Sequence, residues 1–241
     1  MEFVTTQLAS ITALPLWYPF HSHYWLTKTQ FLLNTKFMTS TKMFYRGIAS
    51  AAFFQPLFPL AIMLKRLLID YIKQNNSYSN VVDWILTFLI GMSTAIISNP
   101  LDVLISKRKH AETTLAVIKN TPMRNFYKGF MISSTQNGIF FLALTSMYSY
   151  FAKLFQNNFL GAVASSFLSS LIIVPLDSFV VMKQNNKYNN CGIGHCIRTV
   201  YKEKGFGGLF SGFLSKWVAA TNEIFFFHYF KNFYDAKLLG I

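Results

Sequence analysis

Pro175-Leu176-Asp177 ends one apolar stretch of this chain, and Phe210-Ser211-Gly212 comes just before the next one. Each element occurs three times in the chain. The first is a proline followed two positions later by a polar residue, and the second is an aromatic residue followed two positions later by a glycine. The other two copies are Pro19-Phe20-His21 with Tyr45-Arg46-Gly47, and Pro100-Leu101-Asp102 with Tyr127-Lys128-Gly129. Because a fixed period is the mark of a repeat architecture, we predict a single domain over residues 1–241. Its three diverged copies span approximately residues 1–75, 76–156 and 157–241.

The composition is that of a membrane protein. The 241 residues are 52% hydrophobic and only 13% charged, whereas a soluble domain carries about a quarter of charged residues. Six apolar stretches are near or above the ~20 residues that a helix needs to cross a bilayer; they cover roughly residues 8–31, 48–71, 82–106, 129–155, 158–182 and 211–235. We therefore predict an all-α membrane protein with six transmembrane helices.

The basic residues predict how the chain is oriented. The net charge is +13, and most of the Lys and Arg lie in segments 28–46, 105–128 and 182–211, which would all face one side. Basic loops stay on the cytoplasm-like side of a membrane, which for a mitochondrial inner membrane is the matrix. The charge does not indicate nucleic-acid binding, because it flanks membrane segments and comes without a nucleic-acid-binding motif.

The repeated elements resemble those of the mitochondrial carrier family. The resemblance is clearest in the third copy, which continues from Asp177 to Gln184 and later reads Gly205-Phe206-Gly207-Gly208 before Gly212. It implies a pseudo-threefold bundle of three helix–short matrix helix–helix repeats around a central cavity, in the inner membrane, with both termini toward the intermembrane space. It also implies cardiolipin as the bound lipid, and no other cofactor, at the starts of the even-numbered helices. The residues that match these lipid sites are Arg46, Gly47, Lys128, Gly129, Gly205 and Gly212.

The family closes the matrix side with ion pairs that this chain lacks. In the family, the acid of each proline element pairs with a basic residue three positions later on the next helix. Tyr24, Ile105 and Val180 occupy those basic positions here, so three such pairs cannot form. We expect the acids to find His21, hydroxyls or water instead, or to be protonated. The remnants of the matrix gate are Pro19, His21, Pro100, Asp102, Pro175, Asp177 and Gln184.

The gate on the opposite side is also altered. The family's acid positions fall near Leu67, Ser149 and Asn232, and its basic positions fall near Asp70, Ala152 and Asp235.

The middle of the even-numbered helices is where the family binds its substrates. Lys216 and Glu223 are seven residues apart and share a helical face, which indicates either one charged position in a cavity or a buried pair or subunit contact. Without an Arg at this level, a nucleotide or dicarboxylate substrate is disfavoured. The candidate cavity residues are Gln55, Gln136, Asn137, Lys216, Asn222 and Glu223.

The residues favour a structural role over catalysis. The sequence offers no nucleophile–base set, no metal-ligand cluster and no phosphate loop, so we do not expect an enzyme. Loss of the gating charges, with the prolines and glycines kept, favours an accessory subunit of a larger inner-membrane complex such as a respiratory-chain complex. Its partners would be cardiolipin and other subunits. The alternative is an alternating-access transporter of an unidentified small solute.

Overall fold

The computed structural model describes residues 2–33, 52, 57–74, 78–109, 119–184 and 192–239, and these ranges contain helices and no strand. The elements are α1 (Glu2–Leu33), α4 (Leu57–Gln74), α5 (Asn80–Lys109), α7 (Met123–Phe126), α8 (Phe130–Leu142), the π-helical turn η1 (Ala143–Met147), α9 (Tyr148–Phe155), α10 (Asn158–Gln184), α11 (Ile193–Leu209) and α12 (Phe213–Leu239). The predicted all-α class is therefore confirmed.

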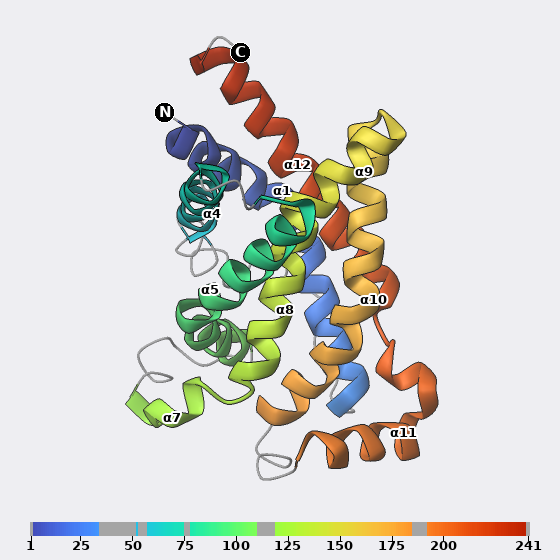
Figure 1. Cartoon of the computed structure of the whole chain (residues 1–241). Helices are drawn as coiled ribbons and strands as arrows, with labels where there is room; N and C mark the ends of the chain where they lie inside the picture. The colour runs from blue at the N-terminus through green and yellow to red at the C-terminus, as the bar shows by residue number, and fades with distance from the viewer. Residues whose placement is uncertain are drawn as a thin grey trace.

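The long helices form one bundle with distinct ends (Figure 1). Helix α1 packs along α12, α5 packs along α8, and α10 contacts α8, α9 and α12. Both chain termini lie at one end of the bundle, and the short helices α7 and α11 lie at the other end. We call these the terminal end and the short-helix end.

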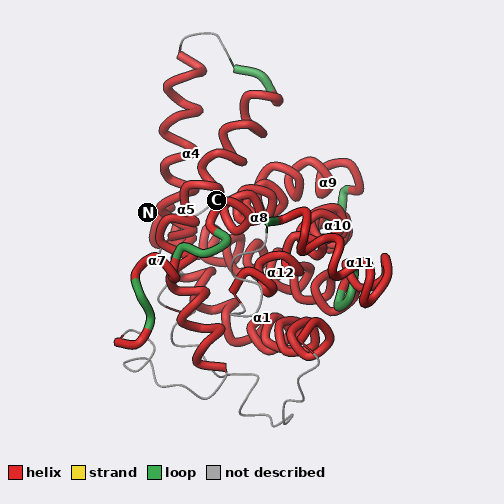
Figure 2. Tube along the Cα trace, turned by 90° about the horizontal axis from the view of Figure 1, so that it is seen from below, coloured by secondary structure: helices red, strands yellow, loops and turns green. Residues whose placement is uncertain are grey.

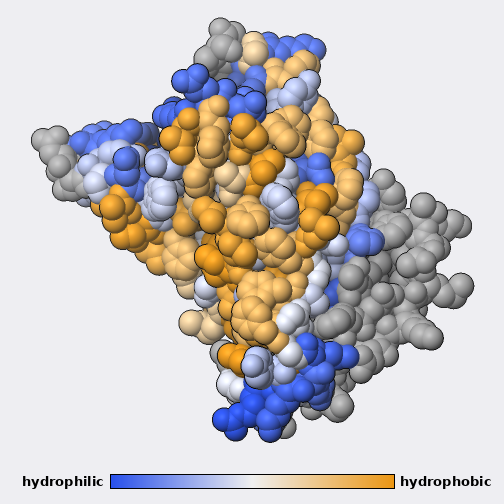
Figure 3. All heavy atoms as spheres, turned by 90° about the vertical axis from the view of Figure 1, so that its right-hand side faces the viewer, coloured by the Kyte–Doolittle hydropathy of each residue, from blue (hydrophilic) through white to orange (hydrophobic). Residues whose placement is uncertain are grey.

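Within the described residues, three segments are long and apolar enough to cross a membrane: Asn80–Pro100, Met123–Phe155 and Asn158–Met182. They correspond to three of the six predicted spans. Figure 3 shows a broad apolar surface on the side formed by α9, α10 and α12, with hydrophilic atoms gathered toward the ends. An apolar exterior of this kind is what lipid requires.

In helix α10 exposed apolar side chains lie on one face and buried polar side chains lie on another, the opposite of a helix in a soluble protein. Its exposed face is apolar and its buried face carries hydroxyls, since residues four apart share one side of a helix. The exposed residues are Phe159, Leu160, Phe167, Leu168, Leu171 and Ile172, and the buried polar residues are Ser165, Ser166, Ser169, Ser170, Asp177 and Ser178. The bundle therefore has a polar interior, and most of these hydroxyls donate to carbonyls one turn back in α10.

The two recurring elements are in contact in the second repeat. Pro100 lies inside α5, where its ring removes one backbone donor and leaves the carbonyl four residues earlier without its helical partner. That carbonyl belongs to Ile96, and the Tyr127 hydroxyl donates to it at 3.3 Å. Asn99 donates to the Phe126 carbonyl at 2.6 Å. The aromatic-x-Gly element thus supports the helix at its proline.

The glycines of this element turn the chain into the next helix. Gly129 and Gly212 have φ angles of 79° and 78°, in the left-handed region where side chains other than glycine are strained. In both turns the residue after the glycine donates its N–H to the carbonyl of the aromatic residue, from Phe130 to Tyr127 and from Phe213 to Phe210. The repeat therefore keeps glycine for a backbone reason.

Small residues let helices approach closely in this bundle. A Cβ added to Gly91 on α5 would lie 2.6 Å from the Phe141 Cβ and 2.8 Å from the Asn137 carbonyl oxygen on α8. A Cβ on Gly161 would lie 2.8 Å from the backbone of Ala152 on α9. Helices within a membrane gain little from the hydrophobic effect when they associate, and close backbone contacts of this kind allow them to pack through van der Waals interactions.

Replacing Gly91 by alanine tests the α5–α8 contact. We expect Gly91→Ala to lower the free energy of unfolding in detergent by about 1–3 kcal/mol, because the added methyl overpacks a backbone contact. Gly194→Ala is the matched control, since nothing lies within 4 Å of its Cβ position in α11. Equal thermal midpoints for the two variants would contradict this packing.

Candidate functional site: the polar network at Asp177

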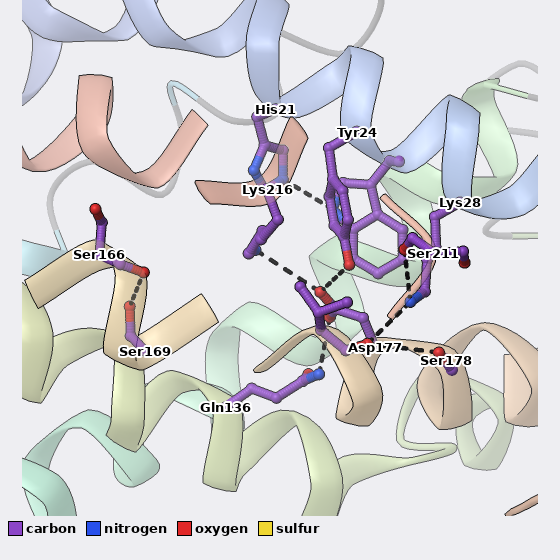
Figure 4. A network of polar contacts seen from close by, with 12 residues as sticks. His21, Tyr24, Lys28, Gln136, Ser166, Ser169, Asp177, Ser178, Ser211 and Lys216 are labelled. Carbon is purple, nitrogen blue, oxygen red and sulfur yellow. Dashed lines mark hydrogen bonds and ion pairs between the residues drawn. The ribbon is translucent and has the colours of Figure 1, made fainter. Parts of the chain in front are cut away.

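Asp177 on α10 is only 2% exposed and is held from three other helices (Figure 4). The Tyr24 hydroxyl of α1 donates to Oδ2 at 2.5 Å, and the Gln136 amide of α8 donates to Oδ1 at 2.8 Å. The Lys216 Nζ of α12 forms an ion pair with Oδ2 at 3.8 Å. Both carboxylate oxygens are therefore occupied. A carboxylate at this depth requires such partners, because burial away from water disfavours an unpaired charge.

The expectation that Asp177 lacks a basic partner is wrong. Its cation is Lys216, which the sequence pattern had assigned to a cavity rather than to the gate. Tyr24, at the family's basic position, supplies the hydroxyl bond that the sequence did allow. Lys216 Nζ also lies 5.1 Å from the centroid of the Tyr24 ring, within the range of a cation–π contact. The same cation thus interacts with both an acid and an aromatic ring.

Gly212 makes room for this arrangement. A Cβ on Gly212 would lie 3.1 Å from the Tyr24 ring, so the glycine serves both the turn and the approach of α1. The carbonyl of Gly212 accepts from the Lys216 N–H at 2.9 Å, in the first turn of α12. The turn therefore sets the position from which Lys216 reaches Asp177.

Lys28 is a second buried cation beside the network. It is 0% exposed, and its Nζ donates to the carbonyls of Val174 at 2.9 Å, Leu209 at 3.2 Å and Ser211 at 3.1 Å. Leu209 ends α11, and carbonyls at a helix end need a donor from outside the helix. Lys28 therefore joins α1 to the proline level of α10 and to the α11–α12 link.

Sequence reasoning missed Lys28 by counting it among the loop charges. One signal was available, because Lys28 follows Tyr24 by four residues and so lies on the same face of α1. Ser178, also buried, donates to the Leu209 carbonyl at 3.2 Å and reinforces the same junction.

The remaining predicted gate residues lie on α1, α5 and α10. His21 accepts a hydrogen bond from the Trp25 indole one turn later, at 2.9 Å. Pro19, Pro100 and Pro175 lie inside α1, α5 and α10. Asp102 and Gln184 belong to α5 and α10, but their side chains lie outside the described part of the structure.

The predicted cardiolipin residues lie at two helix starts and one bend. Gly129 and Gly212 precede α8 and α12, and Gly205 has φ 67° inside α11. Lys128 is partly exposed. The first N–H of both helices is bonded within its turn, from Phe130 to Tyr127 and from Phe213 to Phe210, so this N–H is not available to a phosphate. Arg46 and Gly47 lie outside the described residues.

The predicted cavity residues are only partly brought together. Gln136 and Lys216 meet at Asp177, and Glu223 lies two turns further along α12. Asn137 donates to Thr94 at 3.3 Å and Ser98 at 2.6 Å on α5, and Asn222 donates to the Val218 carbonyl of its own helix. Gln55 lies outside the described residues.

A second ion pair lies toward the terminal end, and sequence reasoning missed it as well. Lys65 of α4 lies 3.2 Å from Asp83 of α5, and the Ser146 hydroxyl of η1 donates to Asp83 at 2.6 Å. Lys65 also donates to Ser146 at 2.9 Å. Asp235, at a predicted basic position, pairs instead with Lys231 four residues earlier in α12. Within the described ranges, no group of three or more His, Cys, Asp or Glu is arranged to hold a metal ion.

The fold and the site together define a helical membrane protein with a polar, charge-paired interior. Residues 153–237 match the family model described as mitochondrial carrier protein. The match runs from the end of α9 through α10 and α11 to residue 237 in α12, and this part of the chain is similar to that family. A search of the curated proteins found no match.

A double-mutant cycle measures the Tyr24–Asp177 bond. We expect Tyr24→Phe alone to lower the free energy of unfolding by about 1.5–3 kcal/mol, the range for a hydrogen bond to a charged group. In the Asp177→Ala background the same change should cost little, because the acceptor is already gone. Tyr229→Phe on the exposed face of α12 serves as the control. Additive effects in the cycle would contradict the bond.

Removing the Lys28 ammonium tests the junction of α1, α10 and α11. We expect Lys28→Met to cost about 2 kcal/mol or more, because buried carbonyls lose their donor. Lys202→Met, on the exposed side of α11, should leave the thermal midpoint unchanged. If both variants melt like the parent protein, Lys28 does not hold the junction.

Proposed function

We propose that this carrier-family protein serves as a structural subunit of a larger assembly in the mitochondrial inner membrane, such as a respiratory-chain complex. The observation that carries the proposal is the fully partnered Asp177. Its carboxylate is bonded from α1, α8 and α12, and Lys28 ties the same region to α11. A buried network in which both carboxylate oxygens have partners stabilises one arrangement of the helices, as a structural scaffold requires.

Energetics favour this role over ordinary carrier gating. Alternating access needs two states of similar free energy. Opening the bundle between α1, α10 and α12 would part Tyr24 and Lys216 from Asp177 and Lys28 from its carbonyls. Breaking a buried ion pair alone costs about 3–5 kcal/mol, and the positions where the family places the acids of its opposite gate fall near Leu67, Ser149 and Asn232.

One observation favours the alternative role, a transporter of a small solute. Lys216 lies 3.8 Å from Asp177, which is longer than a direct hydrogen bond. An ion pair without a direct hydrogen bond is a contact that a solute is able to redistribute.

The membrane arrangement is part of the same proposal. We place the six predicted spans around a pseudo-threefold axis. The short-helix end, which includes Arg124 on α7 and Arg198 on α11, faces the matrix, and both termini face the intermembrane space. Cardiolipin at Gly129 and Gly212 is the lipid partner that the repeat predicts, and no second cofactor is proposed.

Native electrophoresis of digitonin-solubilised mitochondria separates the two roles. We expect the tagged chain to migrate with a large complex and to bring the same set of membrane subunits with it on purification. The purified chain in liposomes should show no saturable exchange of metabolites. Migration as a free monomer, together with specific and saturable exchange, would contradict the structural role and support the transporter.

A further inference from the structure

The continuous helix formed by α8, η1 and α9 contains one wide turn. In Figure 2, α8 lies between α5 and α10, with α12 beside α10. Residues Ala143–Met147 are π-helical, so a backbone hydrogen bond spans five residues there rather than four. The N–H groups at the end of the turn donate to the Ala143 and Thr145 carbonyls, which passes over the Leu144 carbonyl between them. Leu144 is buried, and a buried carbonyl needs a donor.

Helix α12 supplies that donor. The Nε2 atom of His228 lies 2.6 Å from the Leu144 carbonyl oxygen, and because a carbonyl only accepts, this nitrogen carries the hydrogen. The His228 ring also stacks on the Tyr148 ring, with 3.7 Å between the centroids and 9° between the planes. One side chain of α12 is therefore bound both to the wide turn and to the first residue of α9.

The same turn is also bonded to α4 and α5. The Ser146 hydroxyl donates to Asp83 of α5 at 2.6 Å and accepts from Lys65 of α4 at 2.9 Å. The Thr87 hydroxyl of α5 lies 3.0 Å from it, and both hydroxyls are buried. The wide turn thus joins three other helices through polar contacts alone.

An apolar cluster around the turn adds α1 and α10. Its buried members come from α1, η1, α9, α10 and α12, with one residue of α4 packed against them; they are Ala9, Ala143, Leu144, Tyr148, Ala162, Ile224 and Phe227, and the α4 residue is Ile62. The cluster lies toward the terminal end, since Asp83 is in the first turn of α5. Ala162 precedes Asp177 on α10 by about 22 Å along the helix axis.

We propose that η1 closes the terminal end of the bundle and keeps it closed independently of the Asp177 network. Hydrogen bonds tie this turn to α4, α5 and α12, and the apolar cluster adds α1 and α10. Opening this end would take His228 away from a carbonyl that the wide turn leaves without a helical donor, and a buried polar group without a partner is unfavourable. The closure lies at a different level from Asp177, and it does not depend on whether the chain belongs to a larger complex.

Spin-label distances across the terminal end test this closure in the full chain. Lys153→Cys on α9 is combined with Lys73→Cys on α4 or with Asn232→Cys on α12, all at exposed positions. The background carries Cys191→Ser and Cys196→Ser. In phosphatidylcholine–cardiolipin vesicles we expect one narrow distance distribution for each pair.

Two substitutions remove the contacts of the turn one at a time. His228→Leu takes away the donor to the Leu144 carbonyl and should shift the α9–α12 distance to longer values. Ser146→Ala takes away the hydroxyl that binds Asp83 and should broaden the α4–α9 distribution. His195→Leu, at an exposed position of α11, is the matched control and should leave both distances unchanged. Each variant must keep the helical content of the background protein.

Three results would overturn the proposal. Two exchanging distances across the terminal end of the background protein would mean that this end opens. Unchanged distances in both His228→Leu and Ser146→Ala would mean that the turn does not hold it. Asp177→Ala should leave both distances as they are, and a response as large as that to His228→Leu would mean that the two ends are coupled. None of these readouts changes if the chain migrates as a free monomer in native electrophoresis.

Discussion

The need to pair one buried carboxylate organises the short-helix end of this protein. Asp177 lies two residues after Pro175, inside the third apolar span, where water does not reach it. Its partners come from α1, α8 and α12, so these helices must converge at one level. Gly212 contributes to this convergence in two ways. Its left-handed turn directs α12 toward Asp177, and the absence of a side chain leaves space for the Tyr24 ring.

The same logic explains why the two repeated elements persist together. A proline within a helix leaves a carbonyl without its donor, and in the second repeat the following link supplies a donor. Tyr127 supplies it at the Pro100 level of α5. In the third repeat the donor beside Pro175 comes from α1 instead, since the Val174 carbonyl accepts from the ammonium of Lys28. In the second repeat the aromatic-x-Gly element therefore supports the helix at its proline and also forms the turn, independently of the gating charges.

Spacing along the chain predicted the parts of the fold that depend on the backbone. The helices and the glycine turns before α8 and α12 follow from local rules. The contacts between repeats could not be predicted in this way. The position of a residue on a helix gives the direction of its side chain, but it does not tell which other helix that side chain contacts. Lys216 was therefore assigned to a cavity, Lys28 to a loop, and the Lys65–Asp83 pair was missed.

The central claim is that the short-helix end holds one closed arrangement. Distances between spin labels at Arg124→Cys on α7 and Arg198→Cys on α11, in the background without native cysteines, measure it most directly. In cardiolipin-containing vesicles the account predicts one narrow distance distribution, which broadens when Asp177→Ala removes the shared partner. Two exchanging distances in the protein with Asp177 intact would contradict a locked network and indicate a gate that opens.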